Sequence, residues 1–255
     1  RIGMAPTAAL SSFSVGRASS VVVDIGAGLT SVAPVLEGQL SASGIREHQF
    51  AGNSMDSNLA GLLTQSGISL TAEDLAANRN LPESRKRRRT WGTNMRLVRD
   101  LKETVCFCAH QPLSGLESEQ YWHSLPDGQC IDVAAFSRAV PEALLVGSGN
   151  FPGVSKLLGE AVASLSSSQL PAVKASARDV VLVGGSSFFV NLADRLGTAI
   201  SDVTEQKPKL HFVKERRYAA WTGGSMVAGL ELPLVRWFSK QDYQEHGTTV
   251  FSHLT

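Results

Sequence analysis

A run of three valines at residues 21–23 leads directly into Asp24 and two closely spaced glycines, Gly26 and Gly28. Consecutive β-branched residues predict a buried strand. Glycines just after a strand let the backbone turn tightly and bring its N–H groups close to a phosphate, and a carboxylate at the strand's end can hold a metal-bound water. Alone, the pattern fits an ordinary strand-to-hairpin turn equally well.

A second stretch repeats this plan much later in the chain. Residues 180–187, VVLVGGSS, run from apolar residues into Gly184 and Gly185 and then into two hydroxyl residues. The paired glycines again permit the backbone to approach a phosphate or a ribose closely. Two strand-to-glycine turns in one chain predict a single nucleotide held between two lobes.

The composition limits the class of protein. The 255 residues are 43% apolar and carry a formal net charge of +1, which predicts a soluble globular protein and does not require a nucleic-acid partner. No apolar run approaches the roughly 18–20 residues that span a bilayer, so we expect an intracellular protein and no membrane partner. Cys106, Cys108 and Cys130 are too few for a disulfide framework, and we expect buried free thiols.

Five stretches resemble segments of the actin family, in that family's order. Residues 21–38 resemble its second phosphate-binding hairpin, residues 98–109 its adenine-contacting helix, and residues 180–196 its nucleotide-binding glycine turn. Residues 215–230 and 237–247 resemble the segments that close the fold. The chain looks like an actin-related protein rather than a conventional actin, and most like the nuclear actin-related subunits of chromatin remodelling and histone acetyltransferase complexes.

The resemblance implies an α/β fold of the actin-like (ribonuclease H-like) ATPase type, represented by its C-terminal two-thirds: a mixed sheet flanked by helices, with an inserted helical subdomain. Residues 1–50 are expected to form the phosphate-hairpin part of the larger lobe, 51–146 the inserted subdomain, 147–218 the adenosine-side part of the larger lobe, and 219–255 the C-terminal helices. From the resemblance, we expect no counterpart of the family's first phosphate hairpin or of its DNase-loop subdomain within these residues.

The resemblance also implies how ATP and Mg²⁺ would be bound. Lys102 and Glu103 match residues that bracket the adenine and ribose, Phe189 matches an aromatic under the adenine, and Arg217 matches a residue that covers it. Without the resemblance, the first two would be a solvated helix pair and Phe189 a core residue. Asp24 is the expected metal-side carboxylate. The expected nucleotide contacts are Asp24, Gly26, Gly28, Leu29, Thr30, Gly52, Lys102, Glu103, Gly184, Gly185, Ser186, Phe189 and Arg217.

The most polar stretch, residues 82–95, is expected to form an exposed and mobile loop, because adjacent like charges repel one another. Its basic residues are Arg85, Lys86, Arg87, Arg88 and Arg89. The run fits a solvated insertion, a nuclear import signal, or a contact with nucleic acid or an acidic partner. Trp91 beside it is a candidate partner anchor.

The periodicity of apolar residues and the end signals predict several helices. We expect helices at residues 2–17, where Gly16 would cap the end, and at residues 55–64 and 94–110. A capping-box start predicts a short helix at residues 71–81. Residues 237–243 are expected to form the last helical segment.

The groups needed for ATP hydrolysis are reduced in number. Positioning and charge neutralisation supply most of the rate of phosphoryl transfer. Relative to the family pattern, Ala27 replaces the second acidic residue of the hairpin and Ser31 replaces a histidine. Because each lost positioned group commonly lowers a rate by a factor of about 10² or more, we expect no meaningful ATPase activity.

Two functions of different classes follow from the resemblance. The first is a nuclear, non-catalytic scaffold that binds actin or another actin-related protein and clamps a long helix of a Snf2-type motor or scaffold subunit, with an apolar partner surface near residues 221–230 and the final helix. The alternative is a cytoplasmic, cytoskeletal actin-like protein that hydrolyses ATP and polymerises. A sugar kinase or chaperone of the same superfamily is a third, weaker reading, disfavoured by residues 215–230.

Overall fold

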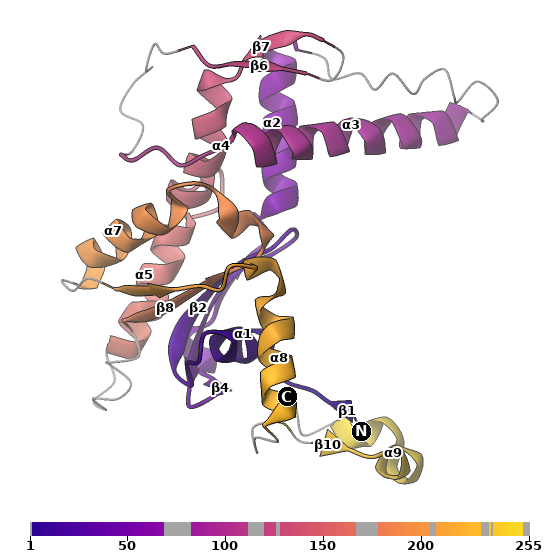
Figure 1. The fold of residues 1–255 in the computed structure, drawn as a ribbon, viewed down its shortest axis with the longest axis vertical. Helices are drawn as coiled ribbons and strands as arrows, with labels where there is room; N and C mark the ends of the chain where they lie inside the picture. Colours follow the sequence, from indigo (N-terminus) through magenta and orange to yellow (C-terminus); the bar gives the residue numbers. More distant parts are fainter. Residues whose placement is uncertain are drawn as a thin grey trace.

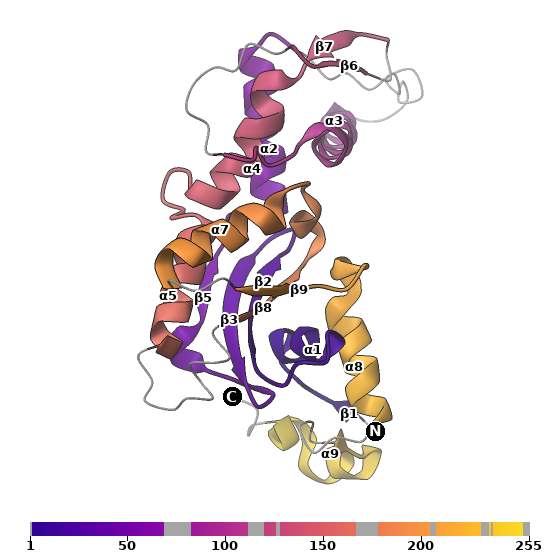
Figure 2. The ribbon, with the colours of Figure 1, turned by 60° about the vertical axis from the view of Figure 1, so that its left-hand side comes forward.

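The larger part of the molecule is a mixed β-sheet with helices on both faces (Figures 1 and 2). The computed structural model describes residues 2–68, 83–111, 120–125, 128–166, 178–204, 208–230, 235 and 237–251. The predicted helix at residues 71–81 lies outside these residues. No described helix is long and apolar enough to cross a membrane.

In the described part of the chain the main sheet has six strands, in the order β4-β3-β2-β8-β9, with β5 also paired to β3. Neighbours β2 and β3 are antiparallel, whereas β2–β8 and β8–β9 are parallel. The predicted mixed sheet is therefore confirmed. Its strands are β2 (Ser20–Ile25), β3 (Thr30–Leu36), β4 (Gln39–Leu40), β5 (Arg46–His48), β8 (Asp179–Val183) and β9 (Lys209–His211).

Side chains on the central strands alternate between two cores. Val21, Val23 and Ile25 pack into the larger core, whereas Val22 packs with Val181 into the smaller one on the opposite face. Helices α5 (Val154–Ser166) and α7 (Leu192–Thr204) cover the first face, and α1 (Thr7–Ser14) and α8 (Ala219–Gly229) cover the second (Figure 2). Apolar residues at consecutive positions therefore follow from burial on both faces.

A second group of elements stands above the sheet in Figure 1 and shares the larger core. Buried Met55, Leu101 and Leu144 join its helices to that core. These elements are α2 (Gly52–Gln65), α3 (Glu83–Val105), the two-stranded sheet of β6 (Trp122–Ser124) and β7 (Cys130–Asp132), and α4 (Ala134–Val146).

The prediction of a loop at residues 82–95 is wrong, because α3 already begins at Glu83. Arginine, lysine and glutamate are good helix formers. Like charges one turn apart destabilise a helix by only about 0.2–0.5 kcal/mol per pair, so repulsion does not prevent the helix. The structure does not describe the side chains of residues 83–93, which include Trp91.

Both ends of the chain also differ from expectation. Residues 2–17 contain a short strand, β1 (Ile2–Gly3), before α1, although Gly16 does take the left-handed conformation, with φ of 70°. Residues 237–243 begin with strand β10 (Trp237–Phe238), which pairs antiparallel with β1, and α9 (Lys240–His246) follows. Single-turn helices complete the fold: η1 (Ala42–Gly44), η3 (Gly185–Phe188), η4 (Arg216–Tyr218) and η5 (Gly247–Phe251).

The cysteines are free, as expected, but they differ in burial. Cys106 and Cys108 are buried, whereas Cys130 on β7 is exposed. Burial raises the pKa of both the Cys106 and the Cys108 thiols to about 12. These two thiols therefore stay protonated at neutral pH and behave as small apolar core residues.

Helices α1 and α8 cross in close contact at Gly223. A Cβ atom at this position would overlap the carbonyl oxygen of Leu10 on α1. The small residues of α8 thus allow the two backbones to pack directly against each other.

We predict that Gly223→Ala destabilises the protein by about 1–3 kcal/mol, because the added methyl group overpacks this crossing. Gly229→Ala is the matched control on the same helix, since position 229 faces open space, and its effect should stay within about 1 kcal/mol. Urea unfolding of both variants measures the difference. Equal stabilities would contradict the assigned packing.

Candidate functional site

The two glycine turns predicted from sequence lie side by side. Strands β2 and β8 are parallel neighbours with Asp24 opposite Val183, so both strands end at the same edge of the sheet. Gly184 has a φ of 93°, and a Cβ there would overlap the carbonyl oxygen of Ile25 and lie 2.5 Å from Asp24 Oδ1. Residue 184 must therefore be glycine for the turns to meet.

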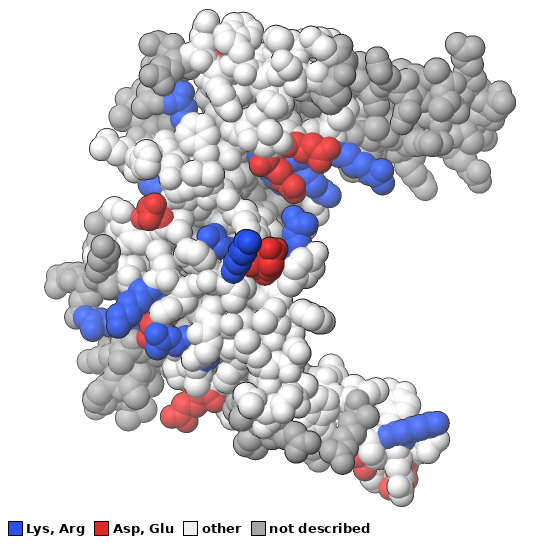
Figure 3. Space-filling view, viewed as in Figure 1, with Lys and Arg blue, Asp and Glu red and all other residues white. Residues whose placement is uncertain are grey.

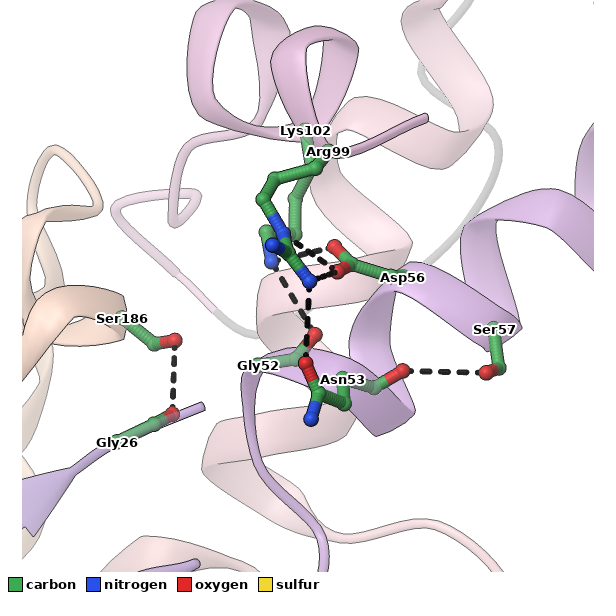
Figure 4. A network of polar contacts seen from close by, with 8 residues as sticks. All are labelled: Gly26, Gly52, Asn53, Asp56, Ser57, Arg99, Lys102 and Ser186. Atoms are coloured by element: carbon green, nitrogen blue, oxygen red, sulfur yellow. Dashed lines mark hydrogen bonds and ion pairs between the residues drawn. The ribbon is translucent and has the colours of Figure 1, made fainter. Parts of the chain in front are cut away.

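The N-terminus of α2 joins the two turns as a third segment. The Gly52 amide donates to the Gly26 carbonyl at 3.0 Å, and the Asn53 amide donates to the Ala27 carbonyl at 2.7 Å. The Ser186 hydroxyl donates to the same Gly26 carbonyl at 3.2 Å (Figure 4). One backbone oxygen is thus the meeting point of the three segments.

A cavity of about 890 Å³ opens between these segments and α3, and Figure 3 shows acidic and basic side chains gathered below α3 beside a hollow of the surface. This volume suits a nucleotide-sized ligand. The cavity is lined by Asp24, Gly26, Ala27, Gly52, Asn53, Arg99, Lys102, Glu103, Thr104, Cys106, Gly184, Gly185, Ser186, Phe188, Phe189, Val190, Glu215, Arg217 and Tyr218.

Asp24, near the end of β2, is half-buried and lines the cavity. Burial raises its pKa above the ordinary value, and no hydrogen bond or ion pair to it occurs among the described residues. No group of three or more metal-ligating side chains occurs in the same part of the chain. A single half-buried carboxylate fits Mg²⁺, which keeps several waters and takes its other ligands from bound phosphates. Asp24 would hold such an ion, and the ion would neutralise phosphate charge.

The wall formed by α3 carries an ion-pair network. Lys102 lines the cavity, but its ammonium donates to the Gly52 carbonyl at 3.1 Å and to Asp56 Oδ1 at 2.5 Å. Arg99, one turn earlier on α3, donates from Nε to Asp56 Oδ2 at 3.0 Å (Figure 4). Glu103 is exposed and lines the cavity. The predicted contact of Lys102 with adenosine stays a prediction.

The opposite wall is formed by η3 and η4, which a stacked arginine joins. The Arg216 guanidinium lies over the rings of Phe188 and Phe212, at 5.4 and 4.0 Å from their centroids. It also donates to the Ser187 carbonyl at 2.7 Å. Stacking and hydrogen bonding together hold the segment that presents Arg217 to the cavity.

Most of the residues expected from sequence line this one cavity, including Phe189 and Arg217. Gly28, Leu29 and Thr30 do not: Thr30 is fully buried and its hydroxyl donates to the Phe50 carbonyl at 2.7 Å, so its side chain holds the hairpin instead. The basic residues 85–89 lie on α3, and the structure does not describe their side chains.

Sequence reasoning missed several lining residues and the carboxylate behind them. Arg99 precedes Lys102 by three residues, so helical spacing alone placed both on one face of α3. Asp56 follows Gly52 by four residues and shares a face of α2 in the same way. Glu215 and Tyr218 lie within two residues of the predicted contact Arg217. This closeness in the sequence was the only signal that could have identified them as lining residues.

The fold and cavity define an α/β protein that can hold a nucleotide-sized ligand at the paired glycine turns of a mixed sheet. A family model described as Actin matches residues 2–253. The chain belongs to the actin family, which confirms the resemblance and the predicted fold class.

One similar relative is Actin-related protein 4 of Arabidopsis thaliana. It is 27% identical to this chain over 283 residues, an alignment that covers 96% of the chain and 63% of the relative. The chain thus spans less than two-thirds of that relative's length.

We predict that Asp24→Asn stabilises the ligand-free protein at neutral pH. A carboxyl whose folded-state pKa is raised contributes its stability at low pH and loses it as pH rises through that pKa, so the ionised Asp24 is unfavourable at neutral pH. Asparagine has the same shape and no charge.

Thermal unfolding in chelator at about pH 7.5 and about pH 4.5 tests this expectation. The variant should unfold at a higher temperature than the natural protein at the higher pH, and this advantage should shrink at the lower pH. A variant that is less stable at neutral pH would contradict the assigned burial of an uncompensated charge.

Proposed function

We propose that this protein is a non-catalytic, nuclear scaffold subunit of a chromatin remodelling or histone acetyltransferase complex that binds ATP without turning it over. The observation that carries the proposal is a nucleotide-sized cavity with both glycine turns in place and with Ala27 in its lining. The cavity retains groups that bind and lacks a second carboxylate at the turn. Family membership and the similarity to an actin-related protein support the same conclusion.

The proposed ligand is ATP with Mg²⁺. Backbone amides and glycines at the ends of β2 and β8 suit phosphates, Phe189 and Arg217 offer faces for a purine ring, and Glu103 can accept hydrogen bonds from ribose hydroxyls. These residues come from three different walls of the cavity. Binding therefore needs the walls to be held together, but it does not need a catalytic base.

The proposed partners are actin or another actin-related protein and a long helix of a Snf2-type motor or scaffold subunit. Exposed apolar side chains occur along α8 and at its C-terminal end: the Trp221 side chain is 76% exposed, and Met226 and Leu230 are also exposed. Exposed apolar side chains on a helix suit helix-in-groove recognition. The basic residues 85–89 at the outer end of α3 (Figure 1) are proposed to serve nuclear import or to contact an acidic partner or nucleic acid.

Calorimetric titration of the intact protein with ATP and Mg²⁺ should show saturable binding, while phosphate release stays at the background rate. Gly52→Val should abolish binding, because a Cβ at position 52 would lie 2.8 Å from Ser186 Oγ and 3.2 Å from Ala27 Cα. Gly61→Ala on the same helix faces open space and should bind normally. A clear burst of released phosphate would contradict the non-catalytic assignment.

Trp221→Ala should weaken recovery of actin and a Snf2-type motor in a pull-down analysed by mass spectrometry, by about tenfold for a central aromatic anchor. Because Trp221 is exposed, thermal stability should not change. Trp122→Ala is the control, since Trp122 is an exposed tryptophan on β6. Equal recovery with both variants would exclude α8 as the partner surface, and filaments that pellet in polymerising salt would favour the cytoskeletal alternative.

A further inference from the structure

Asp56 on α2 is a buried carboxylate that two cations of α3 share. Its side chain is 1% exposed. Lys102 Nζ lies 2.5 Å from Oδ1, and Arg99 Nε and Nη2 each lie 3.0 Å from Oδ2. Each carboxylate oxygen therefore has its own cationic donor (Figure 4).

The same two cations also hold the first turn of α2. Lys102 Nζ donates to the Gly52 carbonyl at 3.1 Å, and Arg99 Nη2 donates to Asn53 Oδ1 at 3.1 Å. Gly52, Asn53 and Asp56 are thus all bound from the α3 side. Because the Lys102 side chain is only 6% exposed, this end of the contact is shielded from water and from screening by salt.

The other side of this turn is bound to the glycine turn after β2. Helix α2 has no side-chain cap at its N-terminus. Two of its first amides are satisfied instead by the carbonyl oxygens of Gly26 and Ala27, at 3.0 and 2.7 Å. The first turn of α2 therefore lies between α3 and the predicted phosphate turn, bonded to both.

We propose that Asp56 is a positioning residue of the cavity. Its two ion pairs lock α3 onto the first turn of α2 and so keep the α2 amides against the turn at Gly26 and Ala27. It also pairs with the Lys102 ammonium, whereas Glu103, the next residue on α3, lines the cavity and is exposed. Asp56 itself does not line the cavity.

Loss of the Asp56 carboxylate should loosen the contact between α3 and the first turn of α2. Loss of a buried ion pair elsewhere in the protein should not loosen this contact. A buried ion pair that loses one partner leaves an uncompensated charge, so general destabilisation is expected for any such pair. The Glu142–Arg195 pair is a suitable comparison: its distances are 2.8 and 3.1 Å, and its side chains are 13% and 10% exposed. Neither residue lines the cavity.

The test compares Asp56→Asn with Glu142→Gln in the intact protein. Hydrogen exchange is measured first without ligand, in peptides covering residues 24–30 and 51–56. Asp56→Asn should speed exchange in both peptides by about tenfold or more, whereas Glu142→Gln should leave them unchanged. The Kd for ATP with Mg²⁺ should then rise about tenfold in Asp56→Asn and stay within about twofold in Glu142→Gln.

Three results would overturn the proposal: unchanged exchange in Asp56→Asn, an equal rise in exchange or Kd in Glu142→Gln, or faster exchange with an unchanged Kd. If Asp56→Asn does not fold, Arg99→Gln decides, because Arg99 is 48% exposed and its loss leaves Lys102 on Asp56. It should give a smaller rise in exchange in the same two peptides, and no rise would count against the proposal.

The predicted change in the Kd for ATP rests on the proposed nucleotide site. Hydrogen exchange measured without ligand distinguishes a failure of that proposed site from a failure of the positioning role. If the natural protein binds no ATP but Asp56→Asn still exchanges faster in both peptides, the proposed function fails and the positioning role stands.

Discussion

The close contact between the backbones that follow β2 and β8 is the constraint on which the site depends. Parallel pairing brings the two strand ends together, and the left-handed Gly184 lets the second turn pass over Ile25 without a side chain between them. Any Cβ at that position would push the strands apart. The cavity, the exposure of Asp24 to it and the approach of Ser186 to Gly26 all require this contact.

Helices on both faces of the sheet make this contact rigid. The alternation of Val21 and Val22 between two cores fixes the register of β2, because a slip by one residue would exchange the two faces. The position of Asp24 at the strand's end is set by the same register. The site is therefore supported by packing on both sides of the sheet, whereas its walls on α3 and η4 are held by polar contacts.

Local patterns predicted the two strand-to-glycine turns, and the resemblance supplied the mixed sheet and many of the residues that line the cavity. Runs of valine before paired glycines predict a strand and a turn from neighbouring residues alone, and the resemblance placed Lys102, Phe189 and Arg217 around them. The basic stretch was misjudged because charge repulsion was weighed above the helix propensity of arginine and lysine. Thr30 was misjudged because its partner, the Phe50 carbonyl, is distant in sequence.

The ion pairs of Asp56 could not be predicted for the same reason. Arg99 and Lys102 are far from Asp56 along the chain, and which acidic residue meets them depends on how α2 and α3 cross. Sequence spacing shows which side chains share a helix face, but it does not show which faces meet. The sequence therefore predicted the strands and the glycines that follow them, but it did not predict which side chains of different helices make contact.

The Gly26 carbonyl receives two donors, one from α2 and one from the turn after β8. A main-chain oxygen is common to all twenty amino acids, so this junction does not depend on the chemical identity of the side chains around it. An alanine can stand at position 27 without removing the bond that its own carbonyl makes to Asn53. The main-chain atoms that join the three segments are thus different from the side-chain atoms that would take part in a reaction. A reactive side chain can therefore be lost while the junction stays.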